Sequence, residues 1–362
     1  MTVTIKDLAR EAGVSVATVS RVLNGRASVS AATRERVLAL AAGLRYVPHG
    51  AARSLVTTKT STIGVLLPDI YGEFFSELIR GIDLAARRHG YHLLVSGSHS
   101  DRAEAAAVLQ ATRGRVDGLI VMSPEIDGDT LRATLPSSLP IVLLNSPNRD
   151  QEYDSIRIDN YGGAFAMIRH FVEVGYRRIA HVGGPASNHD SRERLRGYRE
   201  ALGALGAEID PALEIEADFS EAGGYQAGRR LLAIQPPPRA VFAANDAMAI
   251  GVLCALGEAG VRVPEDMALG GFDDIPTARY VAPPLTSVHV SIDTLGARAL
   301  ERLLIAIDLK NRHERMREVL PTTLVVRASC GAPARGTGAH RNPTEAPSVS
   351  CVDTDSQGRR RP

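Results

Sequence analysis

The chain has 362 residues, of which 44% are hydrophobic and 23% charged, a composition typical of globular proteins with two or three folding units. No apolar run approaches the roughly 18–20 residues of a membrane span, and the N-terminus lacks a basic-then-apolar secretory pattern. We therefore expect a cytoplasmic protein with no membrane partner. Three scattered cysteines, Cys254, Cys330 and Cys351, argue against a disulfide framework and have no metal-like spacing.

The net charge of +1 hides an uneven distribution along the chain. Residues 1–60 carry nine Lys or Arg and three acidic residues, which gives +6, and residues 331–362 carry +2, so the remainder carries −7. A small basic head on a larger acidic body indicates a polyanionic partner for the head alone.

The first 48 residues predict three short helices. Thr4 followed by Asp7 resembles a capping box for a first helix, which Gly13 ends. Ser15 is placed to cap a second helix that runs to about Asn24.

The third helix follows Ser30 as its cap, with a buried stripe formed by Val37, Leu38, Leu40, Ala41 and Leu44. Three helices in about 45 residues, with a tight turn between the first two, predict a helix-turn-helix headpiece over residues 1–48.

The second predicted helix mixes apolar residues with short polar or cationic ones and contains no acid. A surface of this kind suits close approach to DNA, because small side chains and a cation can reach base edges and phosphates. Candidate phosphate donors are Ser15, Thr18 and Ser20; candidate base contacts are Val16, Ala17 and Arg21; Val14, Val19 and Val22 are expected in the core. The alternative is a headpiece that docks a protein or packs only internally.

Residues 49–61 read as a linker, although the stretch AARSL can form a helical turn or two. From residue 62 onward, apolar strands alternate with amphipathic helices, which predicts parallel sheets covered on both faces. Eight of about ten expected strands are at 62–69, 91–98, 118–124, 141–146, 178–184, 213–218, 240–245 and 267–274.

About ten strands over residues 62–330 favour two similar doubly wound α/β lobes, with a cleft where the strand carboxyl ends meet. Residues 331–362 are rich in Pro, Gly, Ser and charge, so we expect a disordered tail.

Several separated motifs resemble the LacI/GalR family of bacterial transcriptional regulators over residues 4–330. They are TIKDLAREAGVSVATVSRVLNG, SAATRERVLALAAGLRYVPHGAARSL, VFAANDAMAIG and PPLTSVHV. The resemblance implies an effector-responsive repressor that binds a near-palindromic operator in double-stranded DNA as a homodimer, joined to a periplasmic-binding-protein-like body. The tail lacks the heptads of tetrameric members, so we expect a dimer.

The resemblance also assigns roles in the headpiece. It implies that Val16 and Ala17 are the main specificity pair and that Arg21 reads guanine. Five further residues are expected to position the phosphates or to fix the turn: Thr4, Ser15, Thr18, Ser20 and Asn24. The alternative for each of them is helix capping or packing. In the family's hinge helix, Leu55 matches an apolar wedge for the minor groove, which Ala52 and Arg53 would line.

In the body, the resemblance implies a small effector, most simply a sugar, in the cleft between the lobes. Candidate contacts near the strand ends are Asp69, Phe74, Asn145, Arg194, Phe219, Asn245 and Asp273. Carboxylates, amides and one arginine suit vicinal hydroxyls, and an aromatic ring suits a sugar face, whereas capping and lobe-bridging hydrogen bonds are the alternative. Asp246 is expected to cap its helix and Asp274 to fix the following turn. Val290 stands where the family often has a polar residue.

Other functional classes have weaker support. His89, His92 and His99 lack an accompanying acid or cysteine, so no metal site is expected, and HVGGPAS lacks the full dinucleotide fingerprint. We expect no catalytic residues and no cofactor. A transport binding protein would share the body but has no use for the basic head. A purine or nucleoside effector, or a corepressor, stays open.

Overall fold

The computed structural model describes residues 3–23, 29–44, 46, 59–146, 152–207 and 209–331. The helices of the headpiece are α1 (Ile5–Ala12), α2 (Val16–Leu23) and α3 (Ala31–Gly43). Thr4 and Asp7 form the predicted capping box, and Gly13 ends α1 in the left-handed conformation with φ of 61°. That conformation suits glycine, which lets the chain turn sharply from α1 into α2.

The headpiece has its own small core, in which Leu8, Val19, Val22 and Val37 are buried. Val14 is half-buried at the edge of this core. The prediction that Leu38 belongs to the buried stripe is wrong, because its exposed fraction is 47%. Val37 and Ala41 lie one helical turn apart and face inward, and Leu38 is rotated about 100° away from them.

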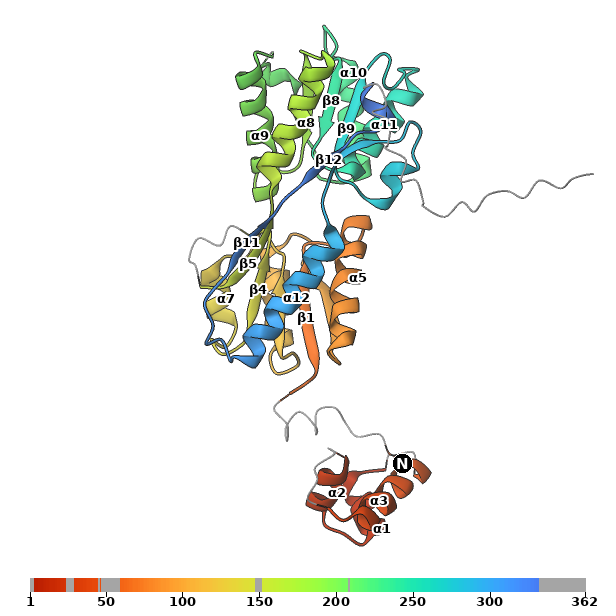
Figure 1. Cartoon of the computed structure of the whole chain (residues 1–362), viewed down its shortest axis with the longest axis vertical. Helices are drawn as coiled ribbons and strands as arrows, with labels where there is room; N and C mark the ends of the chain where they lie inside the picture. The colour runs from red at the N-terminus through yellow and green to blue at the C-terminus, as the bar shows by residue number, and fades with distance from the viewer. Residues whose placement is uncertain are drawn as a thin grey trace, which may run out of the picture.

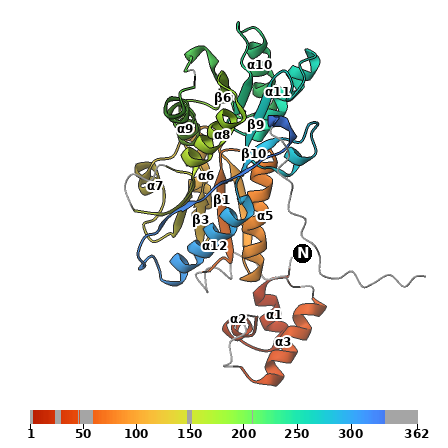
Figure 2. The ribbon, with the colours of Figure 1, turned by 45° about the horizontal axis from the view of Figure 1, so that its top comes forward.

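The first lobe of the body is a six-stranded sheet in the order β11-β5-β4-β3-β1-β2. Its strands are β1 (Thr62–Leu67), β2 (His92–Gly97), β3 (Gly118–Val121), β4 (Ile141–Leu144), β5 (Asp154–Ile158) and β11 (Arg317–Leu320). Its helices are α5 (Glu73–Arg88), α6 (Arg102–Thr112), α7 (Gly128–Thr134) and α12 (Ile292–Asp308), and α5 lies beside α12 in both ribbon views (Figures 1 and 2).

The strands of this sheet are apolar without interruption because both faces are covered. Val65 joins the core beneath α5 and α12, whereas its neighbour Leu66 joins the core beneath α6 and α7. This is the pattern expected of a parallel sheet enclosed by helices.

The second lobe repeats the plan, with strand order β12-β10-β9-β8-β6-β7. Its strands are β6 (Ile179–Gly183), β7 (Glu214–Glu216), β8 (Ala240–Ala243), β9 (Ala268–Asp273), β10 (Thr286–His289) and β12 (Thr323–Val325). Helices α8 (Asn160–Val174) and α9 (His189–Leu205) cover one face, and α10 (Glu221–Leu232) and α11 (Asp246–Glu258) cover the other (Figure 1). Three 3-10 helices, η1 (Pro211–Leu213), η2 (Pro276–Arg279) and η3 (Ala328–Cys330), complete it.

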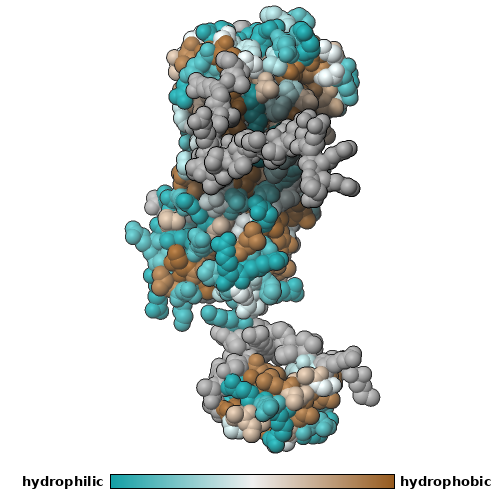
Figure 3. Space-filling view, turned by 45° about the vertical axis from the view of Figure 1, so that its right-hand side comes forward, coloured by the Kyte–Doolittle hydropathy of each residue, from teal (hydrophilic) through white to brown (hydrophobic). Residues whose placement is uncertain are grey.

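The chain passes between the lobes three times, from β5 to α8, from β10 to α12 and from β11 to β12. Each lobe is therefore built from two separate stretches of sequence. The structure contains the eight predicted strands and four that were not predicted, β5, β10, β11 and β12. The face in Figure 3 shows hydrophilic side chains interspersed with small apolar patches. Among the described residues, no helix is long and apolar enough to cross a membrane.

Candidate functional site

Helix α2 presents a mostly uncharged and cationic face to solvent. Val16 is 40% exposed, Ser15, Ala17 and Arg21 are also exposed, and Val19 and Val22 are buried. The helix contains no acidic residue in any turn. The residues that anchor the helix and those that remain available to a partner therefore lie on different faces.

The predicted polar residues of the headpiece also serve local structure. The Ser15 hydroxyl accepts the Thr18 backbone N–H at 3.1 Å and lies 2.9 Å from the Thr18 hydroxyl, so Ser15 caps α2. The Thr4 hydroxyl donates to Asp7 at 2.7 Å. Thr18 and Ser20 are half-exposed on α2. Asn24, Ala52, Arg53 and Leu55 lie outside the described residues.

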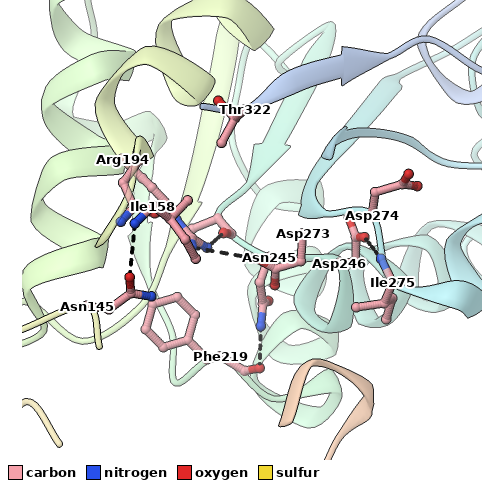
Figure 4. A network of polar contacts seen from close by, with 12 residues as sticks. Asn145, Ile158, Arg194, Phe219, Asn245, Asp246, Asp273, Asp274, Ile275 and Thr322 are labelled. Atoms are coloured by element: carbon pink, nitrogen blue, oxygen red, sulfur yellow. Dashed lines mark hydrogen bonds and ion pairs between the residues drawn. The ribbon is translucent and has the colours of Figure 1, made fainter. Parts of the chain in front are cut away.

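A polar cluster, which we call the interlobe cluster, forms from Asn145, Asn160, Asp190, Arg194 and Asp273 (Figure 4 shows Asn145, Arg194 and Asp273 by name). Asn145 directly follows β4 of the first lobe, and Asp273 ends β9 of the second. Parallel strands bring their carboxyl ends to one edge of a sheet, which is how residues of both lobes reach the same place.

Arg194 is the centre of this cluster and is only 4% exposed. Its Nε donates to the Asn160 side-chain oxygen at 2.8 Å, one terminal nitrogen donates to the Ala244 carbonyl, and the other lies 3.6 Å from the Asp273 carboxylate. The guanidinium also lies over the Phe272 ring, 3.8 Å from its centroid. Contacts on the edge and the face hold this cation in one orientation.

Two members of the cluster, Asp190 and Asn160, were missed by sequence reasoning. Asp190 lies in the first turn of the polar helix α9, and Asn160 begins α8 two residues after β5, a strand that was not predicted. The only available clue is position, since Asp190 precedes Arg194 by one helical turn and therefore shares its face.

Burial leaves three polar atoms of the cluster without a hydrogen-bond partner among the described residues. They are the amide nitrogen of Asn145 and one carboxylate oxygen each of Asp190 and Asp273. The Asn145 oxygen is already engaged, because it accepts the Ile158 N–H at 3.0 Å. One donor and two acceptors thus lack a full hydrogen bond, although the Asp273 oxygen lies 3.6 Å from Arg194 and the Asn145 side chain interacts with Asp190.

The two carboxyl groups have strongly perturbed acidity. Burial raises the pKa of Asp190 to about 6, against the opposing effect of Arg194. Burial raises the pKa of Asp273 to about 7; Arg194 opposes this rise and the nearby Asp190 adds to it. Both carboxyls therefore change charge close to neutral pH.

The backbone is also unusual at three of the predicted residues. Asn145, Phe219 and Asp273 have positive φ values of 46°, 68° and 105°. A bulky residue such as Phe219 rarely adopts this conformation, and strain of this kind concentrates at ligand sites. The Phe219 ring lies so close to Gly184 that any Cβ there would collide with it.

Other predicted residues lie at the margin of the cluster or away from it. Asn245 caps α11 by accepting the Met248 N–H at 2.9 Å, and its amide nitrogen donates to the Phe219 carbonyl at 2.9 Å (Figure 4). Asp69 is exposed and accepts the backbone N–H groups of Ile70 and Tyr71 at 2.7 and 2.9 Å. Phe74 packs edge-on against Phe75, with ring centroids 5.4 Å apart.

The capping role expected for Asp246 is wrong, because Asn245 is the cap of α11. Asp246 is fully buried and instead accepts the Ser287 hydroxyl at 2.6 Å and the Ile275 N–H at 2.9 Å. Burial and the neighbouring Asp273 raise its pKa well above the ordinary value.

Asp274 does not fix the following turn either, since its carboxylate pairs with Arg327 and His289 of other segments, at 2.6 and 3.1 Å. Val290 is buried. The described residues contain no group of His, Cys, Asp and Glu that would hold a metal ion.

Comparisons with known proteins agree with these features. Residues 4–49 match the profile of bacterial regulatory proteins of the lacI family, and residues 168–330 match a periplasmic binding protein-like domain. The chain is 35% identical to the HTH-type transcriptional repressor PurR of Photobacterium profundum, over 90% of this chain and 98% of that protein. It is 36% identical to the ribose operon repressor of Escherichia coli K12, over 88% of this chain and 97% of that protein.

Solved structures show the same relationship. The lac repressor dimer bound to operator and an anti-inducer has a TM-score of 0.81 and 31% identity, covering 91% of this chain and 99% of that one. A complex of the transcriptional regulator CelR with cellobiose has a TM-score of 0.68 and 32% identity, covering 90% and 99%. The chain therefore belongs to the lacI family of bacterial regulatory proteins, which are DNA-binding transcriptional regulators.

Proposed function

We propose that this protein is a repressor that binds a near-palindromic operator as a homodimer and releases it when a sugar-like molecule binds at the interlobe cluster. The headpiece supports the first half of this proposal. The exposed face of α2 carries Val16, Ala17 and Arg21 and no acid, so it suits direct contact with base edges in the major groove.

The proposal that the protein is a homodimer rests on its similarity to a relative of known assembly. The lac repressor structure with 31% identity is a dimer on its operator, and a single α2 reads only half of a palindrome. Within the chain, we infer a headpiece over residues 1–48, a hinge over 49–61, a two-lobed body over 62–330 and a tail over 331–362. We infer that a regulator of this kind acts on operator DNA in the cytoplasm and is not an enzyme.

The single observation that carries the effector proposal is the set of buried polar atoms in the interlobe cluster that lack a full hydrogen bond. A polyol supplies both donors and acceptors on adjacent carbons, which matches the Asn145 amide and the carboxylate oxygens of Asp190 and Asp273. The similarity to CelR, solved as a complex with cellobiose, and to the ribose operon repressor supports the same class. The similarity to PurR makes purines the rival class to be included in any screen.

Isothermal calorimetry on the full-length protein tests the effector class. Pentoses, hexoses, disaccharides, purine bases and nucleosides are titrated into the wild type, Asp273→Asn and Asp129→Asn, a control at an exposed residue of α7. We expect one sugar to bind the wild type and Asp129→Asn equally and to bind Asp273→Asn at least tenfold more weakly. Binding of purines alone, or equal binding to all three proteins, would contradict the proposal.

Fluorescence anisotropy with promoter duplexes tests the DNA-reading surface. Arg21→Ala is compared with Arg10→Ala, which removes the same charge from an exposed residue of α1. Loss of a bidentate base contact costs about 1–3 kcal/mol of discrimination between operator and scrambled duplex. We expect this loss only for Arg21→Ala; equal discrimination by both variants would refute the assignment of α2.

A further inference from the structure

A cavity lies in the second lobe, between α9 and the edge of the sheet formed by β6 and β7. Its volume is about 700 Å³, and Gly183, Ser191, Leu195 and Ile215 are among the residues that line it. The volume is in the range of small-molecule sites. Arg194 and Asp273 are absent from its lining, so the cavity is separate from the interlobe cluster.

The wall of this cavity contains His181, a buried histidine of β6. Its ring stacks with those of Tyr198 and Phe242, and each of these ring centroids lies 5.1 Å from that of His181. Nδ1 lies 3.1 Å from the Phe242 carbonyl oxygen, which can only accept, so the ring proton is on Nδ1. Burial lowers the pKa of His181 to about 4, and the ring is therefore neutral at pH 7.

The other ring nitrogen, Nε2, carries a lone pair and has no hydrogen-bond partner among the described residues. It points toward Gly183, whose missing Cβ would lie 3.2 Å from it. Because Gly183 and His181 both line the cavity, the glycine keeps space open beside an unused acceptor. A buried acceptor without a partner is costly, so this position favours a molecule that brings a donor.

The charged side chains around the cavity are hydrogen-bonded, some to one another and some to backbone groups. Arg199 pairs with Glu214 at 2.8 and 2.5 Å, and Arg196 pairs with Glu193 at 2.7 Å. Glu216 accepts the Ala186 N–H at 3.0 Å. These contacts stabilise the rim of the cavity, and a charged ligand would have to compete with them.

We propose that this cavity is a second binding site for an uncharged, ring-sized molecule that donates an N–H or O–H hydrogen bond to His181 Nε2. Leu195 and Ile215 supply apolar walls for the ring, and the charges of Arg196 and Arg199 at the rim are already balanced by Glu193 and Glu214. Since α9 also carries Arg194, a molecule bound here contacts the same helix that holds the interlobe cluster together.

NMR with ¹⁵N-labelled histidine in the full-length protein tests the site, using indole and phenol as probes and 1-methylindole and anisole as matched controls without a donor. We expect indole and phenol to shift the His181 Nε2 resonance and to bind at least threefold more tightly than the methylated controls, the size of one net hydrogen bond. Equal binding of a probe and its control, or no shift with any probe at millimolar concentration, would overturn the proposal.

Two variants locate the binding. Leu195→Trp fills the cavity and is expected to abolish probe binding, whereas Asp273→Asn is expected to leave it unchanged. Operator binding reports whether Leu195→Trp is folded; if it is not, Gly183→Ala, which crowds Nε2, replaces it. Probe binding that survives filling of the cavity, or that is lost in Asp273→Asn, would contradict the location.

Discussion

Replacing Arg194 with Met removes the cation of the interlobe cluster and keeps a side chain of similar length. The variant loses the hydrogen bonds to Asn160 and the Ala244 carbonyl and leaves the buried Asp273 carboxylate without its counter-ion. Removing one member of a buried ion pair costs about 3–5 kcal/mol. We expect the free energy of unfolding of Arg194→Met to fall by that amount at pH 8.

The cost depends on pH because the pKa of Asp273 is about 7 in the folded wild type. A raised carboxyl pKa means that the folded state favours the protonated form, so the penalty of a buried, unpaired carboxylate is present above pH 7 and disappears as the pH falls. At pH 5.5 Asp273 is protonated in both proteins, and only the lost hydrogen bonds remain. The difference between wild type and variant is then expected to shrink to about 2–3 kcal/mol.

Urea unfolding of wild type, Arg194→Met, Asp273→Asn and the double variant at both pH values measures this coupling. The neutral amide of Asp273→Asn removes the unpaired charge, so the double variant is expected to be more stable at pH 8 than the two single costs predict. Additive costs that do not change with pH would show that Arg194 and Asp273 are not energetically coupled.

Further predictions concern the effector and the headpiece. If effector hydroxyls donate to the Asp273 carboxylate, whose pKa is about 7, wild-type affinity measured by calorimetry is expected to rise by about fivefold from pH 6 to pH 7; a flat profile would contradict that contact. Leu8→Ala opens a cavity in the headpiece core and is expected to lower the stability of that domain by about 2–5 kcal/mol. We expect this variant to lose operator binding while calorimetry still detects the effector. The control Leu38→Ala, at an exposed site, is expected to be neutral. Ser15→Ala removes the cap of α2 and is expected to lower headpiece stability by about 0.5–2 kcal/mol in thermal unfolding, and an unchanged transition would refute the capping role.

Local signals in the sequence predicted the headpiece well. The Thr4–Asp7 capping box and the Gly13 stop depend only on residues within one helical turn, and both are present. Leu38 was misplaced because the sequence pattern offered several adjacent apolar residues and only packing decides which of them turns inward.

One of the missed strands, β11, depends on a partner that is distant in sequence. Strand β11 pairs with β5 through Arg317 and Ser155, more than 150 positions apart, and its burial pattern is largely exposed. Edge strands of this kind lack the continuous apolar run that identified the central strands. The two-lobed plan was predictable, but the three passages between lobes were not.

The interlobe cluster shows the same limit. Asn145 and Asp273 follow buried strands, which made them recognisable as candidates, whereas Asp190 comes from the first turn of a polar helix. The roles of Asn245 and Asp246 were hard to separate because both residues suit a helix N-terminus. Only the structure shows that Asn245 caps α11 while Asp246 is buried against Ser287.

The most direct test of the account measures coupling between the two sites. Operator affinity of the full-length protein is determined by anisotropy with and without the sugar identified by calorimetry, in wild type and in Asp273→Asn. We predict that the sugar weakens operator binding by the wild type by at least fivefold, that the operator weakens sugar binding by the same factor, and that Asp273→Asn shows neither effect at the same sugar concentration. Operator affinity that is unchanged by a sugar bound to the wild type would contradict the central claim that the body controls the headpiece.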